Sequence, residues 1–196
     1  MIAIIDYDTG NLRSVCNALD RIGAEYVLTD DPVVIARADR VLLPGVGEAS
    51  SAMAKLRERG LCDVVRSLKV PVLGICIGMQ LMCRHSEEGD VDCLGIFDAS
   101  VRRFEADPAA GVKVPHMGWN ALMDLKTGLF DGLADGDFVY FVHSFAADVC
   151  EGSIAVSDNG RAFSAAMHKD NFYGAQFHPE KSGEVGDTIL RNFMNL

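Results

Sequence analysis

The stretch Pro71-Val72-Leu73-Gly74-Ile75-Cys76-Ile77-Gly78-Met79-Gln80 joins a short apolar strand directly to a helix. A cysteine stands at the turn, with one glycine two residues before it and another two residues after it. A sharp strand-to-helix turn leaves little room for side chains near an exposed nucleophile, and glycine meets that requirement. The following helix directs its free N–H groups at Cys76, which favours the reactive thiolate. We therefore expect Cys76 to be a nucleophile; a small, buried core cysteine is the alternative.

Strand-like and helix-like segments alternate on both sides of this turn. This order predicts a mainly parallel sheet with helices on both faces, which is a three-layer α/β sandwich of the flavodoxin-like kind. Ligands of such sheets bind at the carboxyl ends of the strands. Strands are expected at residues 2–6, 26–28, 40–43 and 72–75, and helices at 11–22, 32–38, 48–59, 61–68 and 77–84.

The second half of the chain has a different pattern, in which strand-like segments follow one another with turns between them. We expect it to add antiparallel strands to the sheet, which makes the sheet mixed. No linker-like segment separates the halves, so we expect a single domain over residues 1–196. The expected strands are 101–104, 113–117, 138–143, 153–156, 162–167 and 173–177, and a helix is expected at 184–195.

Composition excludes several classes of function. The net charge is −10 and no cluster of Lys and Arg is visible, so we expect no nucleic-acid partner. The longest mostly apolar stretch, residues 70–83, is too short for a membrane span, and we expect no membrane association. The six cysteines form no C-x-x-C pair and no Cys/His cluster, so we expect neither a metal site nor a cofactor. With no signal peptide visible, reduced thiols and a cytoplasmic location are expected.

A thiol nucleophile needs a base, and the base needs a third group that orients it. His178 follows a strand-like segment and precedes Pro179, so its backbone is expected to be extended. In an extended segment residues two apart point the same way, which would place Glu180 beside the imidazole. We expect His178 to be the base and Glu180 its orienting group; the alternative is a surface turn with a solvated carboxylate.

Attack on an amide creates an oxyanion that N–H donors must stabilise. The backbone N–H of Ile77 follows the nucleophile directly and is one candidate. The loop Gly45-Val46-Gly47 follows a neighbouring parallel strand and supplies the other, because glycines allow the backbone to approach a ligand closely. An ordinary glycine-rich turn is the alternative for this loop.

Three segments in this order resemble the class I, triad-type glutamine amidotransferases. They read Pro44-Gly45-Val46-Gly47, then Gly74-Ile75-Cys76-Ile77-Gly78-Met79-Gln80, and then Gln176-Phe177-His178-Pro179-Glu180. The resemblance implies the fold of that family, a catalytic triad of Cys76, His178 and Glu180, and a role for Gln80 in binding glutamine.

Further segments resemble one branch of that family, the glutaminase subunits of imidazole glycerol phosphate synthase. They are Asp6-Tyr7-Asp8-Thr9-Gly10-Asn11-Leu12, Val114-Pro115-His116-Met117-Gly118-Trp119-Asn120, Tyr140-Phe141-Val142-His143-Ser144-Phe145 and Glu180-Lys181-Ser182. The resemblance spans nearly the whole chain and implies that His143, Ser144 and Phe145 take part in binding substrate. Phe145 departs from the family, which usually has tyrosine there.

The resemblance also implies a partner. In the family, glutamine is hydrolysed through a thioester, and ammonia passes to a (βα)₈-barrel cyclase that makes imidazole glycerol phosphate and an aminoimidazole carboxamide ribotide. Residues that match Asn11, Trp119, Tyr140 and Lys181 lie towards the barrel, although the two aromatic residues could be core residues and Lys181 merely solvated. The alternatives left open are a paralogous subunit for another synthase, such as one for amidino-sugar synthesis, and a non-catalytic scaffold of the same fold.

Overall fold

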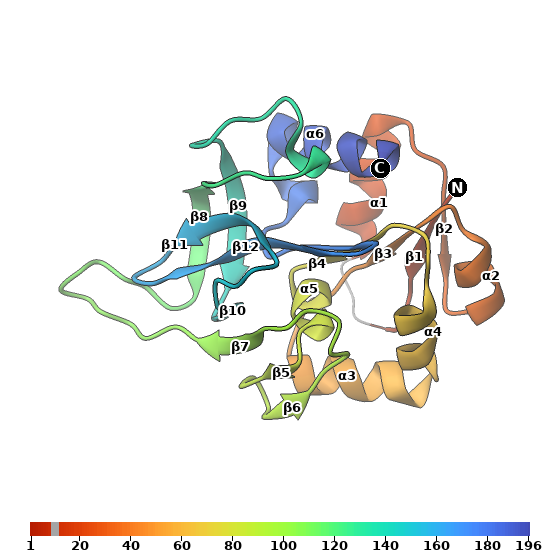
Figure 1. Cartoon of the computed structure of the whole chain (residues 1–196), viewed down its shortest axis with the longest axis horizontal. Helices are drawn as coiled ribbons and strands as arrows, with labels where there is room; N and C mark the ends of the chain where they lie inside the picture. Colours follow the sequence, from red (N-terminus) through yellow and green to blue (C-terminus); the bar gives the residue numbers. More distant parts are fainter. Residues whose placement is uncertain (9–11) are drawn as a thin grey trace.

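The computed structural model describes residues 1–8 and 12–196, and its centre is a mixed sheet between two layers of helices (Figure 1). Five neighbouring strands, in the order β13-β4-β3-β1-β2, run parallel. β12 pairs antiparallel with β13 on one side and with β11 on the other. The bounds are β1 Ile2–Ile5, β2 Tyr26–Thr29, β3 Arg40–Leu43, β4 Val72–Ile75, β11 Ser153–Asp158, β12 Ala162–Lys169 and β13 Phe172–Ala175.

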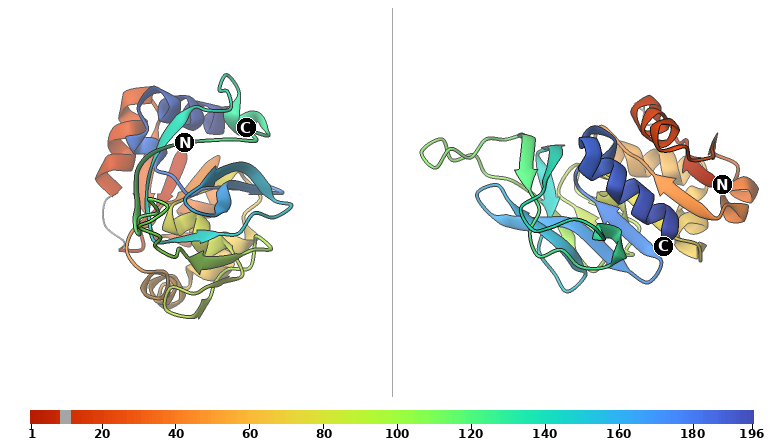
Figure 2. Two further views of the ribbon diagram at one scale, coloured as in Figure 1. Left: turned by 90° about the vertical axis from the view of Figure 1, so that its left-hand side faces the viewer. Right: turned by 90° about the horizontal axis from the view of Figure 1, so that it is seen from above.

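The helices cover both faces of this sheet, as Figures 1 and 2 show. α1 and α6 pack together on one face, whereas α3 packs against α4 and α5 on the other. β4 leads into α5 through Cys76, and the carboxyl end of β3 leads into the loop Pro44–Glu48 before α3. The bounds are α1 Leu12–Ile22, α2 Pro32–Arg37, α3 Ala49–Glu58, α4 Leu61–Ser67, α5 Ile77–Met82 and α6 Gly183–Asn195.

Two smaller sheets flank the antiparallel edge. One has four strands in the order β10-β7-β5-β6, and the other is a two-stranded ribbon of β8 and β9. The loop before β8 extends away from the central sheet, whereas the ribbon itself packs against β12 (Figure 1). The bounds are β5 His85–Ser86, β6 Val91–Asp92, β7 Ser100–Arg103, β8 His116–Ala121, β9 Phe138–His143 and β10 Phe145–Ala147, with 3₁₀ turns η1 at Gly128–Phe130 and η2 at Pro179–Lys181.

The predicted sandwich with added antiparallel strands is confirmed, and several of the predicted segment bounds are wrong. The strand expected at 113–117 begins only at His116, because Pro115 has no N–H to donate to a strand partner. The helix expected at 77–84 ends at Met82, and Cys83 is extended. The strand expected at 173–177 ends at Ala175, before the chain turns towards His178. Within residues 1–8 and 12–196, no helix has the length and apolar character needed to cross a membrane.

Candidate active site

Cys76 lies at a strained turn between β4 and α5. Its backbone has φ 53° and ψ −109°, a conformation that residues other than glycine rarely adopt. A Cβ on Gly74 would lie 2.7 Å from the backbone of Gly78, and a Cβ on Gly78 would lie 1.8 Å from the carbonyl oxygen of Leu43. Both glycines are therefore needed for the helix to begin this close to β3 and β4.

His178 and Glu180 form a buried pair. The distance from His178 Nδ1 to Glu180 Oε1 is 2.8 Å, and each side chain is only 3% exposed. The backbone of His178 is extended, as its position before a proline predicts. The sequence predicts that the backbone stays extended as far as Glu180. This prediction is wrong, because Pro179–Lys181 forms a 3₁₀ turn. A tight turn thus brings the carboxylate back to the imidazole.

The charge of His178 depends on its two neighbours. Burial lowers the pKa of His178, but hydrogen bonds and charge interactions with Cys76 and Glu180 outweigh burial and raise the pKa to about 10. The structure thus brings together the three side chains of the predicted triad. At neutral pH the arrangement favours an imidazolium beside Cys76, which is the state in which a cysteine–histidine pair attacks a carbonyl.

A cavity of about 200 Å³ opens onto Cys76. This volume is below the roughly 300–1,000 Å³ of pockets for drug-sized ligands and suits an amino acid. Six of the residues predicted to bind substrate or the oxyanion line it: Gly47, Ile77, Gln80, His143, Ser144 and Phe145.

The other two residues of the glycine loop lie behind the cavity wall. Gly45 is buried, and a Cβ on it would lie 2.9 Å from both Gly78 N and Tyr7 Oη. Tyr7 Oη also donates a hydrogen bond to the carbonyl of Pro44, at 2.7 Å, which anchors the loop. Val46 is half-buried, and only Gly47, with φ 94°, reaches the cavity. The loop therefore brings one residue, Gly47, to the cavity on which Cys76 opens.

Two polar residues at the site were missed by the sequence reasoning. Glu88 lines the cavity and accepts a hydrogen bond from Ala49 N at 3.0 Å, and burial raises the pKa of its carboxyl group. It stands in a loop between two two-residue strands, where no sequence pattern marks it. Gln176 Nε2 donates to Cys76 Sγ at 3.7 Å. Gln176 belongs to a quoted motif, yet only the folded structure shows that its amide faces the sulfur.

Gln80 is held by both hydrogens of its side-chain amide. Its Nε2 donates to the carbonyl of Phe145 and to Gln176 Oε1, each at 2.9 Å. Its Oε1 is buried and has no hydrogen-bond partner among the described residues. Gln80 lines the cavity, but this oxygen itself has almost no accessible surface, so it is a buried acceptor whose missing donor costs free energy.

Two of the residues predicted to face a partner, Trp119 and Tyr140, lie on the outer face of the ribbon, and Lys181 on η2 lies next to them. Trp119 is 55% exposed, which excludes the alternative that it is a core residue. Its ring meets that of Tyr140 edge to face, with centroids 6.1 Å apart, and Lys181 Nζ lies 6.0 Å from the centre of the Tyr140 ring. Asn11 lies outside the described residues.

The sequence is similar to known proteins over its whole length. It matches the family described as Glutamine amidotransferase class-I over residues 3–196. A protein of Bacteroides fragilis named imidazole glycerol phosphate synthase subunit HisH is 56% identical over 195 residues, which cover 100% of this chain and 99% of that protein. A protein with the same name from Xanthomonas axonopodis pv. citri is 46% identical, over 100% of this chain and 97% of that protein.

Solved structures share the fold at lower identity. A crystal structure of a glutamine amidotransferase superposes with a TM-score of 0.76 and 19% identity, and the match covers 100% of this chain and 98% of that one. A glutamine amidotransferase from Thermotoga maritima superposes with a TM-score of 0.65 and 16% identity, over 99% of this chain and 82% of that one. At this identity the likeness supports the fold alone.

Proposed function

This chain belongs to the class I glutamine amidotransferases, and from that membership we propose that it is the glutaminase subunit of an imidazole glycerol phosphate synthase. The observation that carries the proposal is Cys76 at its strained turn, open to a small cavity and interacting with His178 of the His178–Glu180 pair. The full-length relatives at 46–56% identity carry the name of that subunit, which supports the choice of synthase and its place in histidine biosynthesis.

The first half-reaction releases ammonia. The Cys76 thiolate attacks the side-chain carbonyl of glutamine, and the carbon–oxygen π electrons move to the oxygen. The N–H of Ile77 and the Gly47 loop are proposed to stabilise this oxyanion, because Ile77 and Gly47 line the cavity onto which Cys76 opens. As the tetrahedral intermediate collapses, His178 gives its proton to the leaving nitrogen, and ammonia and a thioester on Cys76 result.

The second half-reaction restores the thiolate. Neutral His178 takes a proton from water while the water oxygen attacks the thioester carbonyl, and collapse expels the Cys76 thiolate and leaves glutamate. Glu180 stabilises each imidazolium that forms, because its carboxylate lies 2.8 Å from Nδ1. Glu180 holds the ring in one tautomer and orientation throughout.

The amino-acid end of glutamine requires groups that bind an ammonium and a carboxylate. Glu88 is the acidic residue that lines the cavity, and we assign it to the α-ammonium group. The side chain of Gln80 lines the same cavity, and we assign it a further contact with the bound glutamine. Ser144 and Phe145 complete the wall on the side of the ribbon.

The ammonia that the reaction releases implies a partner protein. Ammonia released into water at neutral pH is protonated and loses its nucleophilicity, so useful transfer requires a protein that caps the site. We propose a (βα)₈-barrel cyclase that docks on the outer face of the ribbon, where Trp119 and Tyr140 lie next to Lys181. A cytoplasmic location belongs to the same proposal, because all six cysteines are free thiols, as in a reducing compartment.

The experiment that tests this function is a glutaminase assay of the chain alone and with a cyclase barrel and its ribonucleotide ligand. We expect glutamate release to rise on addition of the loaded barrel, and imidazole glycerol phosphate to form in equal amount. Trp119→Ala should weaken this response by raising the barrel concentration needed for half-maximal activity. Activation by a sugar amidotransferase partner instead of the cyclase would move the chain to the paralogous pathway. No glutamate release with any partner would favour the scaffold.

A further inference from the structure

Two histidines lie opposite each other on the inner face of the β8–β9 ribbon. His116 and His143 are cross-strand partners, and both are buried. The outer face carries Trp119 opposite Tyr140, so one ribbon presents aromatic residues outward and imidazoles inward. His116 stacks on Phe141, with centroids 4.9 Å apart and rings 26° from parallel. This packing holds the two imidazoles in fixed orientations.

The hydrogen bonds of the pair have a single possible direction. Asn120 Nδ2 donates to the carbonyl of Asp158 at 2.8 Å, which identifies it as the nitrogen of the amide, and it lies 3.1 Å from His116 Nε2. That ring nitrogen therefore accepts, and the proton of His116 is on Nδ1. His116 Nδ1 lies 3.0 Å from His143 Nε2, so His143 also accepts at Nε2 and carries its proton on Nδ1.

The chain of hydrogen bonds continues to the nucleophile. His143 Nδ1–H donates to the carbonyl of Phe145 at 2.8 Å, and the same carbonyl accepts from Gln80 Nε2. Gln80 donates its second hydrogen to Gln176, whose own amide donates to Cys76 Sγ. The Phe145 carbonyl and the side chains of Gln80 and Gln176 thus connect the ribbon to the sulfur, and every hydrogen bond has a defined donor.

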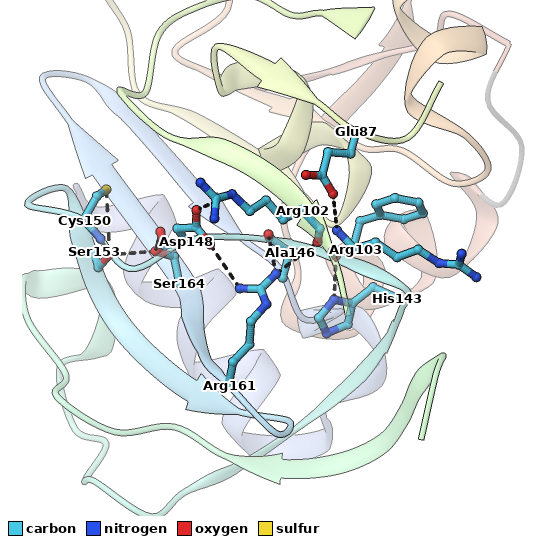
Figure 3. Close-up of polar contacts among 11 residues, drawn as sticks. Glu87, Arg102, Arg103, His143, Ala146, Asp148, Cys150, Ser153, Arg161 and Ser164 are labelled. Carbon is cyan, nitrogen blue, oxygen red and sulfur yellow. Dashed lines mark hydrogen bonds and ion pairs between the residues drawn. The ribbon is translucent and has the colours of Figure 1, made fainter. Parts of the chain in front are cut away.

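The strand β10, which carries the Phe145 carbonyl, is held in place by Arg161. Arg161 donates to the carbonyls of Ala146 and Arg102, on the paired strands β10 and β7, and forms an ion pair with Asp148 (Figure 3). Its guanidinium lies 4.7 Å from the centre of the Phe104 ring, which packs edge-on against His143. Phe145 stands where the family usually has tyrosine. This difference does not interrupt the series of hydrogen bonds, because His143 and Gln80 both donate to the backbone carbonyl of residue 145.

We propose that His116 is a positioning residue for glutamine hydrolysis: it holds His143 as the neutral Nδ1–H tautomer and thereby fixes the Phe145 carbonyl and the Gln80 and Gln176 amides beside Cys76. The proposal rests on the proposed function, since it names a residue that serves the same site. His116 itself does not line the cavity and acts only through His143.

The surroundings of the two imidazoles keep them neutral. Burial lowers the pKa of His116, and burial lowers that of His143 to about 3. The charged or titratable groups around the pair are Asp158, Arg161 and His178. Because each ring is neutral and carries one proton, each hydrogen bond of the pair has only one possible donor.

The test compares three variants in the complex with the cyclase. His116→Phe keeps the stacking on Phe141 and removes both ring nitrogens. Without its donor, His143 can adopt the Nε2–H tautomer, which sets a bare Nδ1 against the Phe145 carbonyl. His116→Asn keeps a donor near the position of Nδ1. His168→Phe is the matched control, because His168 also stacks on an aromatic ring, Tyr173, at 24° and 4.3 Å, away from the cavity.

We expect His116→Phe to lower kcat/KM for glutamine by about tenfold to a hundredfold. His116→Asn should recover most of that loss, and His168→Phe should match the wild type. Synthesis from added ammonium salts should be unchanged in all three, since ammonium bypasses the glutaminase site. The second readout is ¹⁵N NMR of the labelled histidine rings, in which both His116 and His143 should be neutral and protonated at Nδ1.

Three results would overturn the proposal. The first is a folded His116→Phe variant with wild-type kcat/KM, and the second is a wild-type spectrum in which His143 is charged or protonated at Nε2. The third is a His116→Asn variant as impaired as an added His116→Ala variant, and the last two results decide even if His116→Phe does not fold. Failure of the proposed function is a separate result, because it would show as a wild-type protein that releases no glutamate.

Discussion

Cys76 differs from the other five cysteines of the chain in its backbone and in its neighbours. It has a positive φ, it borders the cavity, and it receives a hydrogen bond from Gln176. Cys83, by contrast, is fully buried, and burial raises the pKa of its thiol well above the usual range. The same side chain is thus inert in one setting and a candidate nucleophile in the other.

Glu180 sets the pH range in which His178 carries a proton, so Glu180→Gln should move the alkaline limb of glutaminase activity. Burial lowers the pKa of His178, whereas Cys76 and Glu180 raise it to about 10. Removing the negative charge lowers the pKa, and the imidazolium that protonates the leaving nitrogen is then lost at a lower pH. A shift of about one to three pH units to lower pH is expected in a pH–rate profile.

Glu184→Gln is the control for this shift, because it removes the same charge from an exposed position in the first turn of α6. Its alkaline limb should coincide with that of the wild type. An unchanged limb in Glu180→Gln would mean that Glu180 does not control the protonation of His178.

Two residues of the proposed triad could be predicted from the sequence because they depend on local chain geometry. Flanking glycines identify Cys76, and Pro179 fixes the backbone of His178. Glu88 and Gln176 could not be found in this way. Their role depends on which side chains meet across the folded sheet, and nothing in their local sequence encodes that contact.

Among the elements of the fold, the turn between β4 and α5 requires that residue 78 has no side chain. The variant Gly78→Ala tests this requirement. The added Cβ would lie 1.8 Å from the Leu43 carbonyl oxygen, so α5 or β3 must move. We expect the free energy of unfolding to fall by about 3 kcal/mol in urea titrations, at the upper end of the usual cost of overpacking, because a clash with backbone cannot be relieved by a rotamer change.

Gly128→Ala is the matched substitution, since its Cβ would lie no closer than 3.4 Å to another atom, the flexible Leu196 Cδ2. Its free energy of unfolding should stay within about 0.5 kcal/mol of the wild type. Equal stability of the two alanine variants would show that the turn is not as tight as the structure indicates.

The parallel half of the fold could be predicted more fully than the rest. Its strands are continuous apolar runs, such as Val72–Ile75, separated by helices with clear periodicity. Three strands of the four-stranded sheet, β5, β6 and β10, have only two or three residues each. Segments of that length show no period, and their pairing is set by long-range contacts.

At the scale of the whole molecule, the β8–β9 ribbon connects two surfaces. Its outer face exposes Trp119, while its inner face carries His143, which borders the cavity. A partner that docks on the outer face would therefore contact the same two strands that position the glutamine site. We also propose that the chain is a single domain, because buried residues of the parallel and antiparallel halves form one hydrophobic cluster.

The central claim is that Cys76 performs glutamine hydrolysis for a partner that uses the ammonia, and the Cys76→Ala variant in complex with the cyclase tests it. Synthesis of imidazole glycerol phosphate should be measured with glutamine and, separately, with ammonium salts; Cys62→Ala, on α4, is the control. Cys76→Ala should abolish glutamine-dependent synthesis and leave ammonium-dependent synthesis at the wild-type rate. Retained glutamine-dependent synthesis, or loss of both activities, would contradict it.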